Sequence, residues 1–480
     1  MDITILQWTI MIAFGVIFLI VAPKAKTAAE FFKAKSGKGK EPNVYLLTSS
    51  LVIAWIFAKS IVNAANLGLA FGIVGGLSYA AYYLSFLVGG LVIYKMRVNG
   101  KFESIHHFLR TKYGRSAVTV FSLLIAFRLF NEVWSNTMVI GSFFGTHGSL
   151  SYNASVLVFT FLTLAYTLKG GMRTSLITDS IQMLFFAALL FILLVFILPE
   201  SNASPADYLK SGQWTMTGGL SLLFTVFIQI FSYPFHDPVL TDRGFISSPK
   251  VTRKSYIWAT IVGFLAILLF SLIGIFAKFK GLQGQATVEV SKLLGVAVML
   301  MMNLIMITSA SSAIDSTFSS FSKLVVVDLD KQPIKSIGKG RLAMIVVATL
   351  GTIPVFLDAD ILSATTISGT MVIGLAPVFL FWNISMPKIS FQLSVWTGVA
   401  VGVLLASGKT PAALIWFEGK YGDLLSLNLW GSILCFSLFF LPLLLKKRNG
   451  FKASNGKENI NTLNAGLIDS KNVYESSKSN

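Results

Sequence analysis

The stretch ITSASSAIDSTFSS, Ile307–Ser320, places the carboxylate of Asp315 inside a run of eight serine and threonine side chains. The 14 residues before it, Leu293–Met306 (LLGVAVMLMMNLIM), are as apolar as a membrane span. An ionisable side chain near the centre of a bilayer costs about 2.5–3.5 kcal/mol, so such residues are functional candidates by default. The stretch therefore predicts a membrane helix with a functional polar face.

Composition places the whole chain among membrane proteins. Of its 480 residues, 54% are hydrophobic and 12% are charged, against about 25% charged in soluble proteins, and the mean hydropathy is +0.72. Apolar stretches of about 20 residues, the length of a helix that crosses a bilayer, recur throughout. A β-barrel would show short alternating segments instead. The single cysteine, Cys435, provides neither a disulfide framework nor a cysteine metal cluster.

We predict an all-α polytopic protein with about 13 spans, the first retained rather than cleaved as a signal peptide. The approximate ranges are 3–22, 43–71, 73–95, 116–144, 153–168, 174–198, 217–236, 255–277, 290–328, 341–357, 361–384, 391–407 and 427–445. Of the 39 Lys and Arg residues, 31 fall in the loops after odd-numbered spans and in the C-terminal tail, and 6 in the other loops. This asymmetry places the N-terminus outside and the C-terminus in the cytoplasm. The net charge of +18 therefore reports topology, and no nucleic-acid motif accompanies it.

Five ionisable residues lie well inside these spans: Lys59, Arg128, Glu132, Asp179 and Asp315. Two are positive and three negative, so one bound monovalent cation would balance them. Arg128 and Glu132 are four residues apart on one helix and can pair with each other; they either order the bundle or line a solute site, and Asn131 beside them extends the polar face. Asp179 and Asp315 fall at a similar depth, which predicts a shared cation or a bound proton.

Two spans carry signs of a broken helix. The span at 43–71 has small and polar residues at its middle, and the span at 217–236 ends in FIQIFSYPFHDP, with Pro234 and Pro238. The two spans are five apart in order. Interrupted helices at matching positions of two halves indicate a transporter with inverted repeats, and their freed carbonyls can coordinate an ion.

Several motifs resemble those of the sodium:solute symporter family. They occur in the family's order over about residues 40–385, and they are FESIHHFLRTKYG, KGGMRTSLITDSIQ, HDPVLTDRGF, SSAIDSTFSSFSKLVVVDL and GLAPVFLFW. The resemblance implies the leucine-transporter fold, in which spans two to eleven form two inverted repeats of five helices. The chain then divides into an N-terminal helix with a basic cytoplasmic loop (1–40), a ten-helix core (41–389), two C-terminal helices (390–447) and a disordered cytoplasmic tail (448–480).

The resemblance also implies cation ligands. A first Na⁺ site between core helices one and eight would use the carbonyls of Ile53, Ile56 and Ser309 and the hydroxyl of Ser312. Family members often have a further hydroxyl where this chain has Ala313, which weakens the set. A second, deeper cation site would use Asp179, Ser312, Asp315 and Ser316. Alternatively, the two carboxylates are satisfied by neighbouring hydroxyls and serve only helix packing.

On the solute side, Lys59 lies one turn outward from Ile56, where many relatives contact solute. It would bind a solute carboxylate, pair with Glu132, or replace a transported cation. Tyr233 aligns near an aromatic residue that gates the solute site in some relatives, or it packs at the helix break. With Arg128, Glu132 and Asn131, these residues form the expected solute site.

The resemblance therefore predicts Na⁺-coupled uptake, across the plasma membrane, of a small solute that bears a carboxylate, such as an amino acid or an organic anion. The alternatives are proton coupling, a neutral solute such as urea or a sugar, and a non-transporting receptor on the same fold. Nothing resembles a nucleophilic triad or a phosphate-binding loop, so we expect no enzyme. The expected partners are the solute and the bilayer, with no nucleic acid and no obligatory protein partner.

Overall fold

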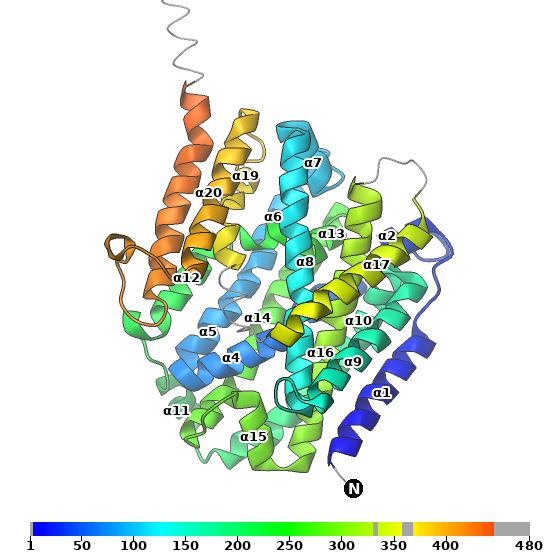
Figure 1. Ribbon diagram of the computed structural model, residues 1–480, viewed down its shortest axis with the longest axis vertical. Coiled ribbons are helices and arrows are strands. Elements are labelled where there is room, and N and C mark those ends of the chain that lie inside the picture. Colours follow the sequence, from blue (N-terminus) through cyan, green and yellow to red (C-terminus); the bar gives the residue numbers. More distant parts are fainter. Residues whose placement is uncertain (1–2, 330–334, 358–367, 446–480) are drawn as a thin grey trace, which may run out of the picture.

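A computed structural model describes residues 3–329, 335–357 and 368–445, and they form a bundle of helices (Figure 1). Ten of these helices are long and apolar enough to span a membrane, or eleven if one bent pair counts as a single span. The predicted count of 13 is not confirmed. Of the three predicted spans outside the ten, one is the bent pair, one is broken into short helices, and the span at 361–384 lies partly outside the described residues.

The N-terminal half contains the first five core helices. The bounds are α1 Ile3–Val21, α2 Ala28–Lys33, α3 Val44–Ile53, α4 Ala58–Phe71, α5 Ile73–Ala80, α6 Leu84–Val98, α7 Ile105–Tyr113, α8 Arg115–Phe144, α9 Leu150–Gly170 and α10 Met172–Glu200. A 3₁₀ turn, Ala81–Tyr83, joins α5 to α6 into one span. Core helix one is the pair α3 and α4, and core helices two to five are the α5–α6 span, α8, α9 and α10.

The second half repeats this order. The bounds are α11 Pro205–Lys210, α12 Ser221–Gln229, η3 Tyr233–His236, α13 Pro238–Arg243, α14 Pro249–Phe279, α15 Ala286–Leu294, α16 Val296–Lys323, α17 Ile337–Thr352, α19 Leu375–Leu380 and α20 Lys388–Ala406. A final helix spans Gly422–Leu445. Core helix six is α12, η3 and α13 together, and core helices seven, eight and nine are α14, α16 and α17.

Both predicted interruptions are present. Core helix one bends by 59° between α3 and α4. Core helix six ends its first part at Gln229 and resumes at Pro238, because Pro234 and Pro238 cannot donate the hydrogen bonds that would continue the helix. Pro238 takes the first position of α13, and the Asp237 side chain accepts from the Val239 amide as its N-cap. The breaks place polar backbone at the middle of the bundle.

The predicted long span at 290–328 is wrong at its start. Gly295, with φ 87°, divides it into α15 and α16, since glycine adopts this left-handed conformation without strain. α15 lies at one end of the molecule, away from α7 and α13 (Figure 1). The polar stretch that decided the fold therefore lies in the second half of a 28-residue helix, and nearly every residue from Ile305 to Ser320 is fully buried.

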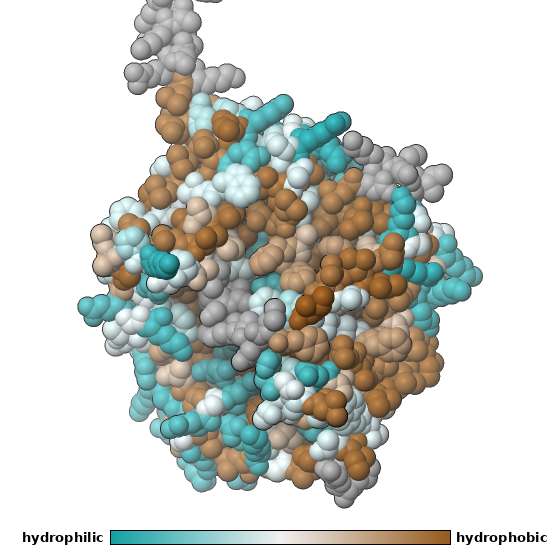
Figure 2. Space-filling view, viewed as in Figure 1, coloured by the Kyte–Doolittle hydropathy of each residue, from teal (hydrophilic) through white to brown (hydrophobic). Residues whose placement is uncertain are grey.

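Hydrophobic side chains cover much of one face of the molecule, and hydrophilic ones gather toward its two ends (Figure 2). This is the pattern of a protein whose sides meet lipid. The N-terminus and the last described helix end at opposite ends of the bundle (Figure 1). That arrangement agrees with termini on opposite sides of the membrane, while the outward orientation of the N-terminus stays a prediction. The tail at 448–480 lies outside the described residues.

Close contact between α4 and α14 depends on two glycines. A Cβ atom at Gly274 would overlap the backbone carbonyl of Ala65, and one at Gly68 would overlap that of Ser271. Small residues at such positions let two membrane helices approach to backbone contact. Core helices one and seven are thereby held as one unit.

We expect Gly274→Ala to lower the stability of the protein by about 2 kcal/mol or more, because backbone must shift to accept the methyl group. Thermal unfolding of the purified protein in detergent measures the effect. Gly338→Ala is the matched control, since only the Ser336 hydroxyl, at 3.6 Å, lies near its added Cβ. Equal melting temperatures for the two variants would contradict the expected close packing.

Candidate functional site

A chain of four charged side chains crosses the centre of the bundle beside the two helix breaks. Lys59 Nζ lies 2.7 Å from Glu132 Oε1, Arg128 pairs with the same carboxylate, and Arg128 Nη2 lies 3.1 Å from Asp237 Oδ2. All four side chains are at most 2% exposed. We call Lys59, Glu132, Arg128 and Asp237 the charge quartet. It is electrically balanced, with two positive and two negative members.

The quartet is tied to both breaks. Asp237 precedes α13, and its Oδ2 also accepts from Trp55 Nε1 at 2.8 Å, in the break of core helix one. On α8, Ser135 accepts a hydrogen bond from Lys59 at 3.0 Å, and Asn136 donates to Glu132 Oε2 at 3.0 Å. The Arg128 guanidinium lies over the rings of Phe57 and Tyr233, at 5.4 and 5.6 Å. Desolvated cations are stabilised by aromatic faces in this way.

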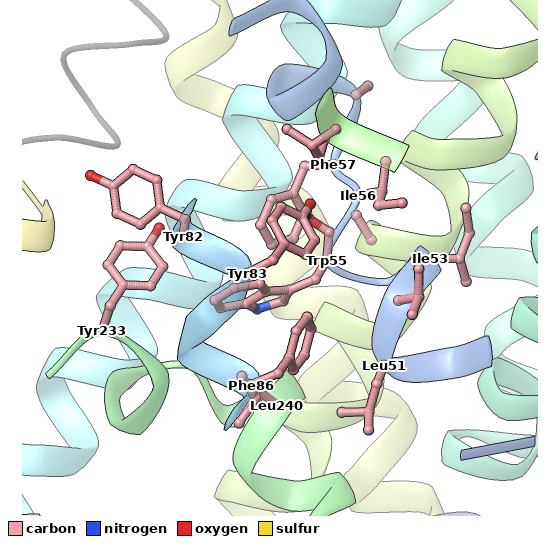
Figure 3. Close-up of a cluster of buried hydrophobic side chains, with 14 of the residues drawn as sticks. Leu51, Ile53, Trp55, Ile56, Phe57, Tyr82, Tyr83, Phe86, Tyr233 and Leu240 are labelled. Atoms are coloured by element: carbon pink, nitrogen blue, oxygen red, sulfur yellow. Dashed lines mark hydrogen bonds between the residues drawn. The ribbon is translucent and has the colours of Figure 1, made fainter. Parts of the chain in front are cut away.

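A small cavity lies next to the quartet and is walled by aromatic side chains. Its lining residues are Trp55, Phe57, Ser60, Tyr79, Tyr82, Tyr83 and Tyr233. Figure 3 shows Trp55 between Tyr83 and Phe86, with Tyr82 and Tyr233 facing each other to one side. The Tyr79 hydroxyl lies 3.3 Å from Ser60 Oγ and accepts from Asn63 at 3.2 Å. The cavity thus combines flat apolar walls with a few hydroxyl groups.

Several buried polar atoms near the quartet have no hydrogen-bond partner among the described residues. They are Arg128 Nε, Asn131 Oδ1, Asn136 Oδ1 and His236 Nε2. Most buried polar groups in proteins are paired, so each exception calls for a missing partner such as a ligand or water. These atoms come from α8 and from the break in core helix six, and the break also supplies Tyr233 to the wall of the aromatic cavity.

The predicted first cation site is assembled from oxygen atoms. The Ser309 hydroxyl meets the Ile56 carbonyl, at the break of core helix one. The Ser312 hydroxyl, one turn further along α16, meets Asp179. Ile53 is the last residue of α3, so its carbonyl belongs to the helix end that the break leaves open. Carbonyl and hydroxyl oxygens are ligands that suit a hard cation such as Na⁺, so these residues fit the ion.

The predicted deeper site is a dense hydroxyl network around two carboxylates. Asp315 Oδ1 accepts from Ser175 at 2.8 Å and from Ser316 at 3.3 Å. Its Oδ2 accepts from Tyr166 and Thr178, each at 3.0 Å. Four hydroxyl groups thus surround one fully buried carboxyl group. Asp179 lies in the same network, because Ser175 Oγ is also 3.4 Å from Asp179 Oδ2.

Arg243 enters this deeper site from α13. Its Nη2 lies 3.2 Å from Asp179 Oδ2, 2.6 Å from Ser316 Oγ and 3.3 Å from Ser175 Oγ. Its Nε donates to Ser50 at 2.6 Å and its Nη1 to the Val239 carbonyl at 2.9 Å. The guanidinium is fully buried. It therefore lies among the groups that were expected to hold a second cation.

A second ion cluster lies nearer the end of the bundle that carries α7. Lys323, at the end of α16, lies 2.7 Å from Asp242 Oδ1 on α13 and 2.9 Å from Asp328 Oδ2. His106 Nδ1 lies 3.6 Å from Asp328, and burial lowers the pKa of this histidine, which keeps the ring neutral at pH 7. The cluster joins core helices six and eight at the surface of a polar cleft.

The sequence missed part of this site. Asp237 completes the quartet, and Arg243 and Lys323 are buried ion partners. Asp237 and Arg243 lie outside the predicted spans, and Lys323 lies near the end of the span at 290–328. The short α13 begins just after Asp237 and carries Arg243 back into the bundle, and its Asp242 pairs with Lys323. The only sequence signal was the spacing of six residues between Asp237 and Arg243 in the HDPVLTDRGF motif.

The sequence was also compared with known protein families. Residues 42–211 match the sodium:solute symporter family. The match begins before α3 and ends just after α11, so it covers core helices one to five and includes Lys59, Arg128, Glu132 and Asp179. Over these residues it confirms the resemblance that the motifs predicted, and the sodium:solute symporter family is one of transporters rather than enzymes. No curated protein matches the sequence.

Solved structures extend the comparison to the fold. A Na⁺-coupled sialic acid symporter, in a substrate-bound outward-open state, is 14% identical with a TM-score of 0.73 over 92% of this chain and 98% of its own. Mhp1, a nucleobase-cation-symport-1 family transporter in a closed conformation with bromovinylhydantoin bound, is 11% identical, with a TM-score of 0.55 over 89% and 96%. The inward-facing conformation of Mhp1 gives 12% and 0.51, over 89% and 95%. These likenesses confirm the predicted all-helical fold.

Proposed function

We propose that this protein takes up a small organic solute by Na⁺-coupled secondary transport. The observation that carries the proposal is a charge imbalance. The buried positive side chains at the middle of the bundle are Lys59, Arg128 and Arg243, and the negative ones are Glu132, Asp179, Asp237 and Asp315. Counted as ionised, these seven groups leave one negative charge uncompensated in a low-dielectric interior, which is costly unless a cation joins it. The family match over residues 42–211 supports Na⁺ as that cation.

The Na⁺ ion would be held by the carbonyls of Ile53 and Ile56 together with Ser309 and Ser312. This position is consistent with the imbalance, because Ser312 also contacts Asp179, whose network includes Asp315. When bound, the ion would supply the missing positive charge and tie α16 to the break in core helix one. Its arrival from outside would thus favour the conformation in which a solute can bind nearby.

For the solute, we propose a zwitterion such as an amino acid. The charge quartet supports a carboxylate on one side, because Arg128 Nε has no acceptor and Lys59 lies beside it on Glu132. The aromatic cavity supports a cationic or apolar group on the other side. Since the quartet is already balanced, a solute with a full net charge would unbalance it, and this disfavours an organic anion.

A neutral solute such as urea or a sugar is the second candidate. The pairing of Lys59 and Arg128 with Glu132 and Asp237 favours it, because no cation of the quartet lacks a carboxylate. The hydroxyl groups of Ser60 and Tyr79 and the amide of Asn131 could then serve a polar uncharged molecule. The two candidates differ in whether the solute has a carboxylate to place on Arg128.

Transport assays in proteoliposomes test both the coupling to Na⁺ and the class of solute. We expect an inward Na⁺ gradient to drive accumulation of an amino acid, and an inside-negative potential to increase it, because one Na⁺ with a zwitterion carries one positive charge. An organic monoanion with one Na⁺ would be electroneutral and insensitive to potential. Replacing the Na⁺ gradient with K⁺ at constant pH is the control.

The proposal would be abandoned if no amino acid, organic anion, sugar or urea accumulated in response to Na⁺. Accumulation of a sugar or urea alone would keep the coupling and replace the solute class. Accumulation that follows a proton gradient at constant Na⁺ would replace the coupling ion instead.

A further inference from the structure

A guanidinium group fills the position where a second coupling ion was expected. We propose that Arg243 is the built-in cation of the deeper site, so that this transporter binds one Na⁺ per chain rather than two. The inference rests on the Na⁺ coupling proposed above and adds its stoichiometry. It also assigns Arg243 a role in ion selectivity, as a residue that positions Asp179 and excludes an alkali ion.

The contacts of Arg243 leave no room for a second ion in this conformation. Its Nη2 donates toward three of the oxygens that an ion would need, on Asp179, Ser175 and Ser316. The remaining oxygen of Asp179 meets Ser312, and Asp315 is surrounded by four hydroxyl donors. A planar guanidinium with five donors suits such a cluster of acceptors better than a spherical ion does.

Charge counting leads to the same number. With Arg243 included and every group counted as ionised, the side chains buried at mid-depth give three positive and four negative charges, so a single Na⁺ neutralises them. A second Na⁺ would leave an excess positive charge next to a guanidinium. Without Arg243 the deficit would be two charges, which is the condition for two ions. The arginine therefore takes the electrostatic place of one cation.

Because Arg243 is part of α13, the cation that replaces the second ion is attached to core helix six. α13 belongs to core helix six, whereas Asp179 is on α10 and Ser316 on α16. The guanidinium thus joins the second half of core helix six to core helices five and eight. Unlike a free ion, it cannot dissociate into the cytoplasm, so its contacts must break and reform on the same side chain in each transport cycle.

Equilibrium binding of ²²Na⁺ to purified protein tests the stoichiometry directly, without any transport. We expect the wild-type chain to bind one Na⁺. Arg243→Gln should bind two, because it removes the positive charge and leaves the oxygens of Asp179, Ser175 and Ser316 available. Arg243→Lys, which keeps the charge, should bind one.

Arg97→Gln is the matched control. Arg97 also makes partly buried hydrogen bonds near α13, to the carbonyls of Gly244 and Ser247, and none of its hydrogen bonds within the described residues goes to a carboxylate. We expect its Na⁺ count to stay at one. If Arg243→Gln fails to fold, Ser316→Ala is compared with the wild type: under the proposal both bind one Na⁺, whereas a fall from two bound Na⁺ to one would place a second Na⁺ at Ser316 and overturn it.

Two bound Na⁺ in the wild type would overturn the proposal and leave Na⁺-coupled transport standing. One bound Na⁺ in a folded Arg243→Gln variant would overturn it too, since the guanidinium would then not be what excludes the ion. No bound Na⁺ in the wild type is a different result, which contradicts the proposed coupling itself.

Discussion

Lys59→Met and Glu132→Gln should each destabilise the protein strongly, and the double variant should recover most of the loss. Each single change leaves an uncompensated charge in a fully buried group, an effect worth about 3–5 kcal/mol when one partner of a buried pair is removed. The double change removes one positive and one negative charge and leaves Arg128 paired with Asp237 at 3.1 Å. Melting temperatures in detergent for the wild type and the three variants measure this coupling.

The exposed pair Lys292–Glu289, 2.8 Å apart, is the control. Lys292→Met should change stability by less than about 1 kcal/mol, because solvent screens exposed pairs. A double variant as unstable as the two single variants would show that Lys59 and Glu132 do not neutralise each other. The double variant should also lose stabilisation by solute, since Lys59 is gone while the fold is kept.

Asp315→Asn should weaken Na⁺ binding by about thirtyfold. One helical turn separates Asp315 from Ser312 of the proposed Na⁺ site, and a unit charge at about 7 Å is worth about 2 kcal/mol in an effective dielectric of about 20. The change also makes the buried charges equal, three positive and three negative, so the ion is no longer needed for neutrality. The Na⁺ concentration that half-saturates the thermal shift measures the affinity.

Asp207→Asn removes the same charge from the exposed α11 and should leave Na⁺ affinity unchanged. An unchanged Na⁺ affinity in Asp315→Asn would mean that Asp315 serves packing alone, as its four hydroxyl neighbours would also allow. The distinction matters because Asp315 is the one carboxylate in the polar stretch Ile307–Ser320.

Uninterrupted apolar runs made most of the fold predictable. α1, α8 and α10 follow the predicted spans to within a few residues, because a bilayer requires about 20 apolar residues per helix whatever the partners. The start of α16 was missed for the same reason: hydropathy continues through Gly295, and only the backbone conformation of that glycine ends α15. Apolar composition marks burial in lipid, not where a helix turns.

The site was harder to predict, because its ion partners come from different helices. The sequence showed Lys59, Arg128 and Glu132 as costly residues inside spans, and pairing of Lys59 with Glu132 was one stated possibility. Asp237 and Arg243 instead lie in a polar segment outside the predicted spans, and Lys323 lies near the end of one, where a charge costs little. They are buried because α13 packs inside the bundle, and no local sequence pattern predicts this packing.

Trp55 has a mechanical consequence. Its indole holds Asp237, at the break of core helix six, while its carbonyl accepts from the Tyr83 hydroxyl at 2.7 Å, in core helix two. A broken helix alone would be a soft joint, and two of them would flex independently. Because Trp55 contacts both breaks, we expect the two breaks to move together rather than independently. We therefore expect the conformational change of the transport cycle to break the contact between Arg128 and Asp237, with little bending within core helices one and six.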